Sequence, residues 1–352
     1  MVDEAKLNQL VGKMLGDLGG AFSVPMVRMG EALGLYKALK EKGAMTVAGL
    51  AKETGIAERY AREWLSHQAA SGYLDYDSAT GTFTLTPEQA MVFADSDSPV
   101  YLQGAFDLAV AMIENQAKVE PAFRIGKGVG WGDQAPCLFC TTGRFFRPGY
   151  QNNLVASWLP ALDGVVAKLE RGATVADVGC GHGFSTIFMA KAFPKSTFVG
   201  YDFHPSSVEQ ARVHARQHGA TANARFEVAL AAEYPGKDLD LVTFFDCLHD
   251  MGDPVGAARH VRSTLKPDGT WMVVEPAAAD RLEDNLNPVG RMYYAGSTMI
   301  CVPTSLDQPV GTALGAQAGF AKLSSAIKEG GGFAKVRKAT ETPFNMVLEA
   351  RA

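Results

Sequence analysis

The sequence predicts an α/β protein: a Rossmann-like, doubly wound sheet of seven strands, the last one antiparallel, preceded by an α-rich winged-helix domain. Two patterns predict this architecture. From Thr174 onward, β-rich runs alternate with helical runs, which is typical of a parallel sheet with helices on both faces. Before residue 98, helical segments lead into one short hairpin. We therefore expect domains over residues 1–98 and 166–352, joined by a mostly helical linker over residues 99–165.

The N-terminal domain is predicted from three local patterns. Residues 45–74, "MTVAGLAKETGIAERYAREWLSHQAASGYL", indicate a helix, a turn at Gly55 and a second helix, as in a helix-turn-helix. Residues 74–87, "LDYDSATGTFTLTP", alternate apolar and polar residues around a turn and predict the wing hairpin. Ahead of them, apolar residues recur at helical spacing and predict an amphipathic helix that packs on a partner subunit: Leu7, Leu10, Val11, Met14, Leu15 and Leu18.

The sheet of the C-terminal domain is predicted from six β-rich stretches. Five of them alternate with helical runs: "TVADVG", "STFVGYD", "ARFEVA", "LDLVTFFD" and "GTWMVVEP". The sixth, "GFAKVRKATETPFNMVLEAR", contains two strand-like runs separated by a short turn at Pro343. Because the turn is short, these two strands should pair antiparallel.

A glycine-rich loop follows the first predicted strand. In "VADVGCGHGFS" the glycines are Gly179, Gly181 and Gly183, and such residues let the backbone approach a ligand at the carboxyl end of a strand. The spacing is G-x-G-x-G rather than the G-x-G-x-x-G of dinucleotide sites, and Asp177 precedes it. A carboxylate repels a diphosphate and attracts an ammonium. We therefore expect S-adenosylmethionine as cofactor, because it carries an α-ammonium and a sulfonium but no phosphate.

A second anchor for the same ligand follows the second predicted strand. Asp202 in "VGYDFHP" lies 19 residues after Gly183, where an acidic side chain accepts both hydroxyls of a ribose. NAD would use the same aspartate, so Asp202 alone does not discriminate between the two cofactors. The pair of Asp177 and the glycine spacing does.

Composition and charge exclude several classes of partner. The net charge is −5 and the pI is about 5.8, and residues 1–100 hold nine Lys and Arg against thirteen Asp and Glu. DNA affinity depends on phosphate contacts and needs the opposite sign, so we expect no nucleic-acid binding. The N-terminus has no basic region leading into an apolar segment, and no apolar run reaches the ~18 residues of a membrane span. With only five cysteines, we expect a cytoplasmic protein with reduced thiols.

The Cys137-x-x-Cys140 pair raises the question of a zinc or redox site. A structural zinc site needs about four ligands, and no second Cys or His pair follows nearby. A redox pair is expected where a helix starts, whereas "APCLFCTTG" is interpreted as a loop. We therefore expect no metal in this protein and a reduced, half-buried pair.

The motifs "DVGCGHG", "YD" and "LKPDGTWMVVEP" resemble those of class I S-adenosylmethionine-dependent methyltransferases. A winged helix ahead of this fold is similar to the small-molecule O-methyltransferases. The resemblance implies that residues 1–98 serve dimerisation and close the substrate pocket, that the linker caps the cofactor, and that residues from about 277 to 325 form a lid. It also implies a homodimer and a small-molecule acceptor.

The same resemblance implies the site residues. His249 in "FFDCLHDMGDP" matches the general base of O-methyltransferases, with Asp250 as its orienting partner, although a histidine that only packs here is an open alternative. The expected cofactor contacts are Tyr150, Asp177, Gly179, Cys180, Gly181, Gly183, Asp202, Phe203 and Asp246. The expected acceptor contacts are Asn287, Arg291, Tyr293 and Tyr294. Many relatives hold the adenine amine with a polar residue after the third strand, where this chain offers only Glu233.

Two questions of function stay open at this point. An oxygen acceptor is favoured because an imidazole can take a hydroxyl proton near neutral pH, but sulfur and nitrogen acceptors are alternatives. A different class of function is a winged-helix transcriptional regulator that binds S-adenosylmethionine as a ligand.

Overall fold

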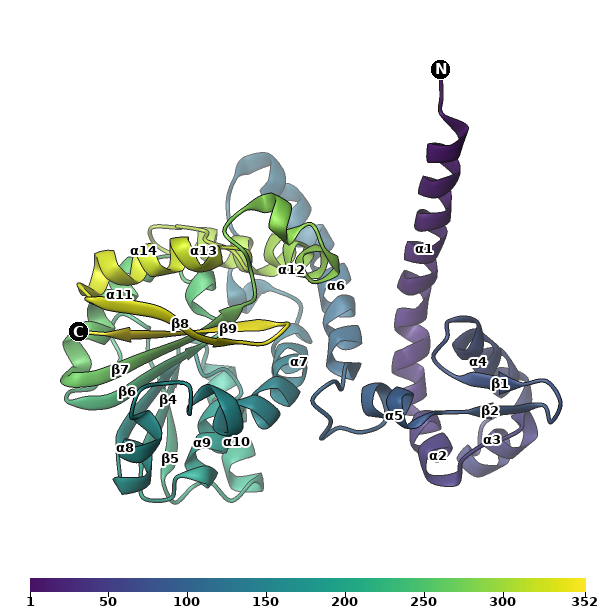
Figure 1. Cartoon of the computed structure of the whole chain (residues 1–352), viewed down its shortest axis with the longest axis horizontal. Coiled ribbons are helices and arrows are strands. Elements are labelled where there is room, and N and C mark those ends of the chain that lie inside the picture. Colours follow the sequence, from purple (N-terminus) through teal and green to yellow (C-terminus); the bar gives the residue numbers. More distant parts are fainter. The chain divides into compact units, whose positions relative to one another are not determined.

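The computed structural model describes residues 1–352 and separates into two compact units (Figure 1). The first contains residues 1–110 and 144–148, and the second contains residues 111–143 and 149–352. The domain boundaries that we predict near residues 98 and 165 stay predictions. None of the helices combines the length and the apolar character needed to cross a membrane.

The first unit is built around a helix-turn-helix and a hairpin. Its elements are α1 (Glu4–Ala32), α2 (Leu35–Lys42), α3 (Val47–Thr54), α4 (Glu58–Ala70), the strands β1 (Asp75–Asp77) and β2 (Thr82–Thr84), and α5 (Pro87–Phe93). The turn between α3 and α4 begins at Gly55, whose φ of 71° closes α3 with a left-handed residue. β1 and β2 pair antiparallel, as expected for the wing. The predicted winged-helix architecture is therefore confirmed.

The core of this unit is aromatic. The ring of Tyr36 lies 5.0 Å from both Trp64 and Phe93, edge-on to the first and stacked on the second. Its hydroxyl donates to Oε1 of the fully buried Gln68 at 2.6 Å, so the polar end of the ring is satisfied inside the core. α1 contributes to this core only through its C-terminal third, where Ser23, Val27 and Gly30 are buried.

The second unit is a seven-stranded sheet with the order β5-β4-β3-β6-β7-β9-β8. The strands are β3 (Thr174–Val178), β4 (Thr197–Asp202), β5 (Ala224–Val228), β6 (Leu239–Phe245), β7 (Leu265–Pro276), β8 (Lys335–Glu341) and β9 (Asn345–Arg351). β3 to β7 pair in parallel, whereas β9 inserts between β7 and β8 and is antiparallel to both. The predicted seven strands and the antiparallel last strand are confirmed.

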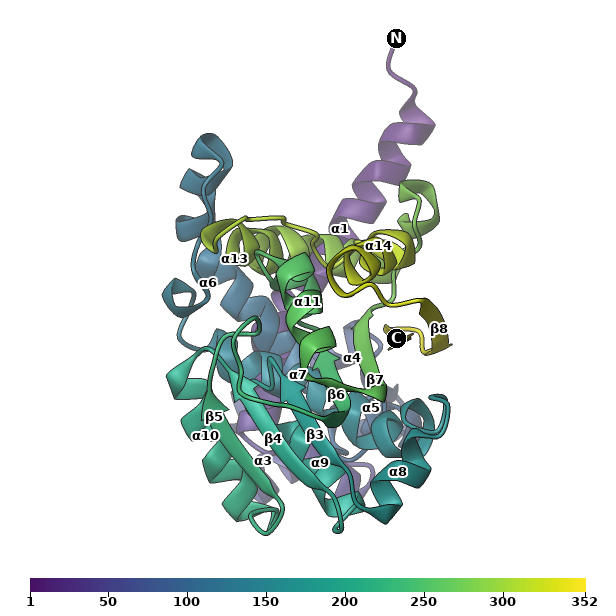
Figure 2. The ribbon, with the colours of Figure 1, turned by 90° about the vertical axis from the view of Figure 1, so that its left-hand side faces the viewer.

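Helices cover both faces of this sheet. α11 (Pro254–Thr264) and α14 (Gly319–Gly331) pack against each other on one face, and α8 (Val165–Arg171), α9 (Phe184–Ala192) and α10 (Pro205–Gln217) lie on the other (Figure 2). The chain runs outward from β3 through β4 to β5, and in the other direction from β6 to β7. The carboxyl ends of β3 and β6 therefore border the crevice where doubly wound sheets bind ligands.

Two further segments complete the chain around this sheet. Ahead of it run α6 (Gln103–Ile125), the short η1 (Trp131–Asp133), α7 (Leu138–Asn153) and the π-helical η2 (Leu154–Trp158). The η3 turn (Leu248–Asp250) follows β6, and η4 (Leu282–Asn285), α12 (Pro288–Gly296), the π-helical η5 (Ser297–Cys301) and α13 (Val302–Asp307) follow β7. The predicted helical character of residues 99–165 is correct. The interpretation of residues 135–143 as a loop is wrong, because α7 starts at Leu138.

Candidate functional site at the carboxyl ends of β3, β4 and β6

The glycine loop leaves β3 in a conformation that only glycine adopts easily. Gly179, Gly181 and Gly183 have φ values of 73°, 50° and 79°. A side chain at Gly179 would meet Cys247 Sγ at 2.7 Å, and one at Gly183 would meet the Phe226 ring at 2.6 Å. At Gly181 nothing lies within 4 Å. The outer two glycines thus serve packing, while Gly181 presents bare backbone to open space where a ligand can approach.

Asp177 lies directly beneath this loop and is completely buried. Its Oδ2 accepts hydrogen bonds from Ser185 Oγ at 2.7 Å and Thr186 Oγ1 at 2.5 Å, and its Oδ1 accepts one from Thr243 Oγ1 at 3.0 Å. Burial raises the pKa of Asp177 to about 6, and the three hydroxyl donors limit the rise. The carboxyl is therefore mostly ionised at neutral pH and ties β3, the start of α9 and β6 together.

Asp202, the last residue of β4, holds the other side of the loop. Its Oδ2 accepts from the Gly181 amide at 2.9 Å, and its Oδ1 accepts from the His204 amide at 2.9 Å. Burial raises the pKa of Asp202, and the two amides act against that rise. Each carboxylate oxygen has further lone pairs, so the group can accept hydroxyls from a ligand while it holds the loop.

Asp246 occupies a strained position where β6 ends. Its φ is 50°, in the left-handed region, which is uncommon for a residue other than glycine. The Tyr150 hydroxyl donates to its Oδ2 at 2.9 Å, and Asn345 Nδ2 donates to its Oδ1 at 2.8 Å. Burial and the nearby Glu275 raise the pKa of Asp246 to about 8. The structure thus brings α7, β6 and β9 together at one carboxyl group.

His249 lies two positions beyond Cys247 in the η3 turn and is buried between two carboxylates. Its Nδ1 lies 2.5 Å from Oε2 of Glu275, and its Nε2 lies 3.1 Å from Oδ1 of Asp250. Burial by itself lowers the pKa of His249, but the charges of Asp250 and Glu275 outweigh burial and raise it well above its usual value. Glu275 also accepts the Leu248 amide at 2.9 Å, so its position is fixed.

Glu275 and Asn345 are site residues that our sequence analysis does not name. Glu275 stands near the end of β7, next to β6 in the sheet, so its place at a strand end in "MVVEP" is a signal that was available. Asn345 begins β9, and its position beside Asp246 depends on the insertion of β9 between β7 and β8. That insertion cannot be read from residue pattern alone.

The predicted acceptor residues fall into two groups. Tyr293 is buried in α12, and its hydroxyl donates a hydrogen bond to the Phe344 carbonyl at 2.7 Å. The charges of Asp246 and His249 are close enough to influence its pKa. Asn287 instead caps α12 by accepting the Gly290 amide at 2.8 Å, and it is exposed, as is Arg291. Tyr294 is half-buried. Tyr293 is thus brought to the end of β6.

An apolar row stands beside Asp202 on the open side of the sheet. Phe203, Val228 and Leu230 are between 44% and 52% exposed although they are large and hydrophobic. Cys180 is buried within the glycine loop. Glu233, which we considered for the adenine amine, is exposed. Exposed apolar side chains that lie together are often covered by a ligand.

The comparisons with known proteins agree with this geometry. Residues 169–331 match the family model described as "Methyltransferase domain". This part of the chain is a methyltransferase domain. Residues 21–94 match the model described as "Rv2258c-like winged HTH domain", so a winged helix-turn-helix domain precedes it.

The relatives and solved structures described below are methyltransferases by name. A ubiquinone biosynthesis O-methyltransferase of Xanthomonas campestris pv. campestris is 38% identical over 112 residues, which are 31% of this chain and 46% of that protein. This chain thus spans about half the length of the curated relatives that it matches. Similar folds over nearly the whole chain occur in an O-methyltransferase family protein from Burkholderia thailandensis (TM-score 0.70, 17% identity, covering 100% of this chain and 99% of that one). Human N-acetylserotonin methyltransferase in complex with SAM is also similar (TM-score 0.68, 18% identity, 97% of both chains).

The winged helix has few free cations on its would-be recognition helix. Arg59 pairs with Glu63, and Arg62 pairs with Glu58 at 3.9 Å, both within exposed turns of α4. The charges of these four side chains cancel, so they give this helix no net positive charge for phosphate contacts.

The glycine loop yields a stability prediction. Gly183→Ala should lower the free energy of unfolding by more than Gly181→Ala. Both substitutions pay roughly 1–2 kcal/mol for a left-handed residue, but only the first also drives a side chain into Phe226 and Ala211. Denaturant unfolding of the two variants measures the difference. Equal destabilisation would show that the contact with Phe226 does not constrain the loop.

Proposed function

We propose that this protein transfers the methyl group of S-adenosylmethionine to a small-molecule acceptor, with an oxygen acceptor favoured. One observation carries the proposal: a methyltransferase domain presents open backbone at Gly181 beside the Asp202 carboxylate. The solved structures of similar fold include one in complex with SAM.

The residues present fit this cofactor. Asp202 would accept the two ribose hydroxyls, Gly181 would allow the sugar and methionine part to lie against the backbone, and the exposed Phe203, Val228 and Leu230 would cover the adenine. Three hydroxyls already donate to the oxygens of Asp177. Asp177 would therefore attract the ammonium through its negative charge, from beneath the loop, and not through a direct hydrogen bond. Tyr150 and Asp246 would line the methionine end.

The cofactor supplies a methyl group on a positively charged sulfur. The protein's main contribution would be to hold the acceptor oxygen in line behind that methyl in a site that excludes water, and such positioning is worth up to ~7–11 kcal/mol in well-oriented systems. The acceptor oxygen bonds to the methyl carbon as the carbon–sulfur bond breaks, and S-adenosylhomocysteine leaves. His249 Nε2 would take the proton of the acceptor hydroxyl, which adds roughly 10²–10⁴-fold.

Glu275 would orient His249 for this role. Its carboxylate holds Nδ1 at 2.5 Å, so the ring can take a proton only at Nε2. The contact of Asp250 with Nε2 stabilises the protonated ring, and Asp250 would have to yield that nitrogen to the acceptor hydroxyl. The raised pKa of His249 favours the protonated ring, so the ring must release that proton before it can act as the base.

Two further proposals concern the setting of the enzyme. The free cysteines would stay reduced in the cytoplasm, where we place the protein. We also propose a homodimer formed through α1. No residue in the first two-thirds of this helix is buried, and an apolar row there stays exposed: Leu7, Leu10, Val11, Met14, Leu15, Leu18 and Phe22.

The placement of the ribose is tested with Asp202→Ala. Loss of both hydroxyl acceptors and of the loop contact should weaken binding of S-adenosylmethionine at least about 100-fold, because two hydrogen bonds to a charged group are worth roughly 3–6 kcal/mol. Isothermal titration calorimetry measures the affinity. Asp253→Ala, which removes only the cap of α11, is the matched control. Unchanged affinity in Asp202→Ala would contradict this placement.

The base is tested through the pH profile. Because the pKa of His249 is raised, the neutral ring and the rate should increase as pH rises above neutral. Asp250→Asn removes one of the charges that raise this pKa, so the rise should begin at lower pH. His249→Ala should keep cofactor affinity and lose roughly 10²–10⁴-fold in turnover.

The rate is followed as formation of S-adenosylhomocysteine with an acceptor found by labelling cell extract with methyl-labelled cofactor. His67→Ala, a histidine of the winged helix, is the control and should keep the wild-type profile. Full activity of His249→Ala would remove it as the base.

The dimer is tested with the double substitution Leu10→Asp and Leu15→Asp. Two charges in the apolar row should convert the dimer to monomer, as measured by light scattering at several concentrations. Gln9→Asp places a charge on the opposite side of the helix and should leave the dimer intact. A monomeric wild-type protein would refute the proposal.

A further inference from the structure

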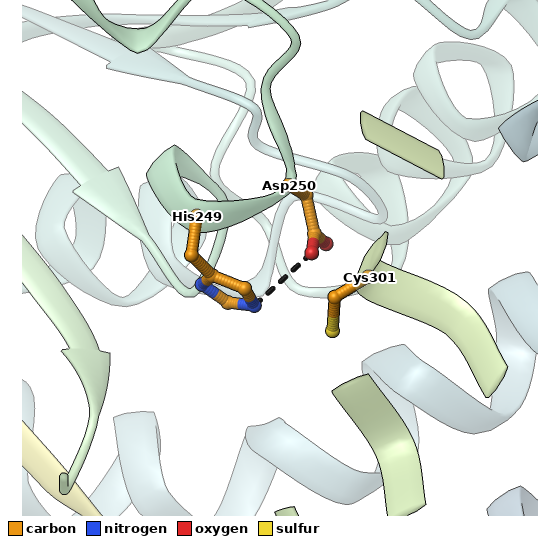
Figure 3. Close-up of side chains that lie close together, drawn as sticks. All are labelled: His249, Asp250 and Cys301. Carbon is orange, nitrogen blue, oxygen red and sulfur yellow. Dashed lines mark ion pairs between the residues drawn. The ribbon is translucent and has the colours of Figure 1, made fainter. Parts of the chain in front are cut away.

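Three different metal-ligating side chains converge next to β6. The Nε2 atom of His249, a carboxylate oxygen of Asp250 and the Sγ atom of Cys301 all lie within 4.8 Å of one another (Figure 3). His249 and Asp250 belong to the η3 turn, whereas Cys301 ends the π-helical η5, more than fifty residues further along the chain. Figure 3 shows the imidazole and the carboxylate facing each other, with the thiol beside them on the neighbouring helix.

We propose that His249, Asp250 and Cys301 bind a single zinc ion. One nitrogen, one oxygen and one sulfur ligand form the mixed set that zinc accepts, whereas Mg²⁺ and Ca²⁺ prefer oxygen ligands alone. Three protein ligands leave a fourth tetrahedral position for water or another small ligand. This proposal differs from our expectation from the sequence that the protein holds no metal.

The spacing suits tetrahedral coordination. Metal–ligand bonds of about 2.0–2.3 Å place neighbouring ligand atoms about 3.3–3.8 Å apart. Nε2 of His249 and Oδ1 of Asp250 are already 3.1 Å apart. The Sγ atom of Cys301 lies within 4.8 Å of both atoms, so side-chain adjustments of about one ångström would bring the three ligands to these distances.

The surroundings of the three ligands are those of a built site. Glu275 holds Nδ1 of His249 at 2.5 Å, which directs Nε2 toward the other two ligands, as carboxylates commonly do for metal-bound histidines. Oδ1 of Asp250 is buried, and Nε2 of His249 lies 3.1 Å from it. When the ring is neutral with its proton on Nδ1, both atoms are electron-pair donors, and a cation between them would satisfy both.

Charge favours a cation at the same place. The carboxylates of Asp250 and Glu275 carry two negative charges against at most one positive charge on His249. A π-helix also carries Cys301 to this position, and π-helical turns occur frequently at functional sites. Cys301 has no role in the proposed methyl transfer, so that chemistry does not explain its place beside His249 and Asp250.

Zinc binding would act on the proposed function through one shared atom. The metal would occupy Nε2 of His249, which otherwise takes the proton of the acceptor. The site would thus let a thiophilic metal ion switch the base off. This consequence rests on the proposed role of His249, whereas the binding of the metal itself does not.

The test uses cobalt(II) as a spectroscopic substitute for zinc, added to the full-length protein without cofactor. The wild type should bind one equivalent and show the visible bands of tetrahedral cobalt together with a sulfur-to-cobalt charge-transfer band. Added zinc should abolish both. Cys301→Ser should lose the charge-transfer band, and Glu275→Gln, which leaves all three ligands in place, should weaken binding roughly 10–100-fold.

The pair of half-buried Cys137 and exposed Cys140 provides the matched control. The double substitution Cys137→Ser and Cys140→Ser removes two thiols elsewhere and should leave the cobalt spectrum unchanged. Circular dichroism confirms that each variant is folded, and Asp250→Asn is a second ligand removal if Cys301→Ser does not fold. The proposal is overturned if the wild type shows no charge-transfer band, if the band persists in Cys301→Ser, or if only the control loses it.

The same experiment separates this inference from the proposed function. Asp202→Ala should bind cobalt like the wild type although it loses the cofactor. Cobalt binding in a protein that proves to have no methyltransferase activity would leave the metal site standing. Methyl transfer by a protein that binds no cobalt would refute the metal site alone.

Discussion

The ligand crevice depends on one buried carboxylate. Asp177 has no exposed surface, and its two oxygens collect hydroxyls from the first turn of α9 and from β6. A buried carboxylate without such partners would be neutral or would destabilise the fold. With them, it joins a strand, the helix that follows it and the neighbouring strand at the point where strand order reverses. The conformation of the glycine loop and the positions of Asp202 and Asp246 follow from that junction.

Two buried carboxyl groups at the strand ends differ in pKa because their surroundings differ. Asp177 is mostly ionised near neutral pH because three hydroxyls donate to it, with a pKa of about 6. Asp246 lies near Glu275 and has a pKa of about 8, so it holds a proton there. The site therefore keeps its negative charge beneath the loop and around His249, and not where β6 ends. A cationic sulfonium and an uncharged acceptor would each find a suitable neighbour.

Much of this arrangement was predictable from residue patterns. Alternating strands and helices predicted the sheet, the three glycines located its ligand edge, and Gly55 located the turn of the helix-turn-helix. These features are local, because each depends on residues close together in the chain. The start of α7 was missed because Gly and Pro residues obscure its helical pattern. Glu275, Asn345 and Cys301 were missed for another reason: each meets its partner through pairing of distant segments, and for Cys301 through a π-helical turn that no simple periodicity predicts.

The bond between Asp202 and the Gly181 amide also bears on how the crevice behaves when it is empty. The side chain that would bind the ribose also holds the loop, so the loop has its conformation before a ligand binds. Little conformational entropy is then lost when a ligand enters, and the affinity reflects the contacts made more than the cost of ordering the loop. A crevice preorganised in this way would bind its ligand without first having to order the loop.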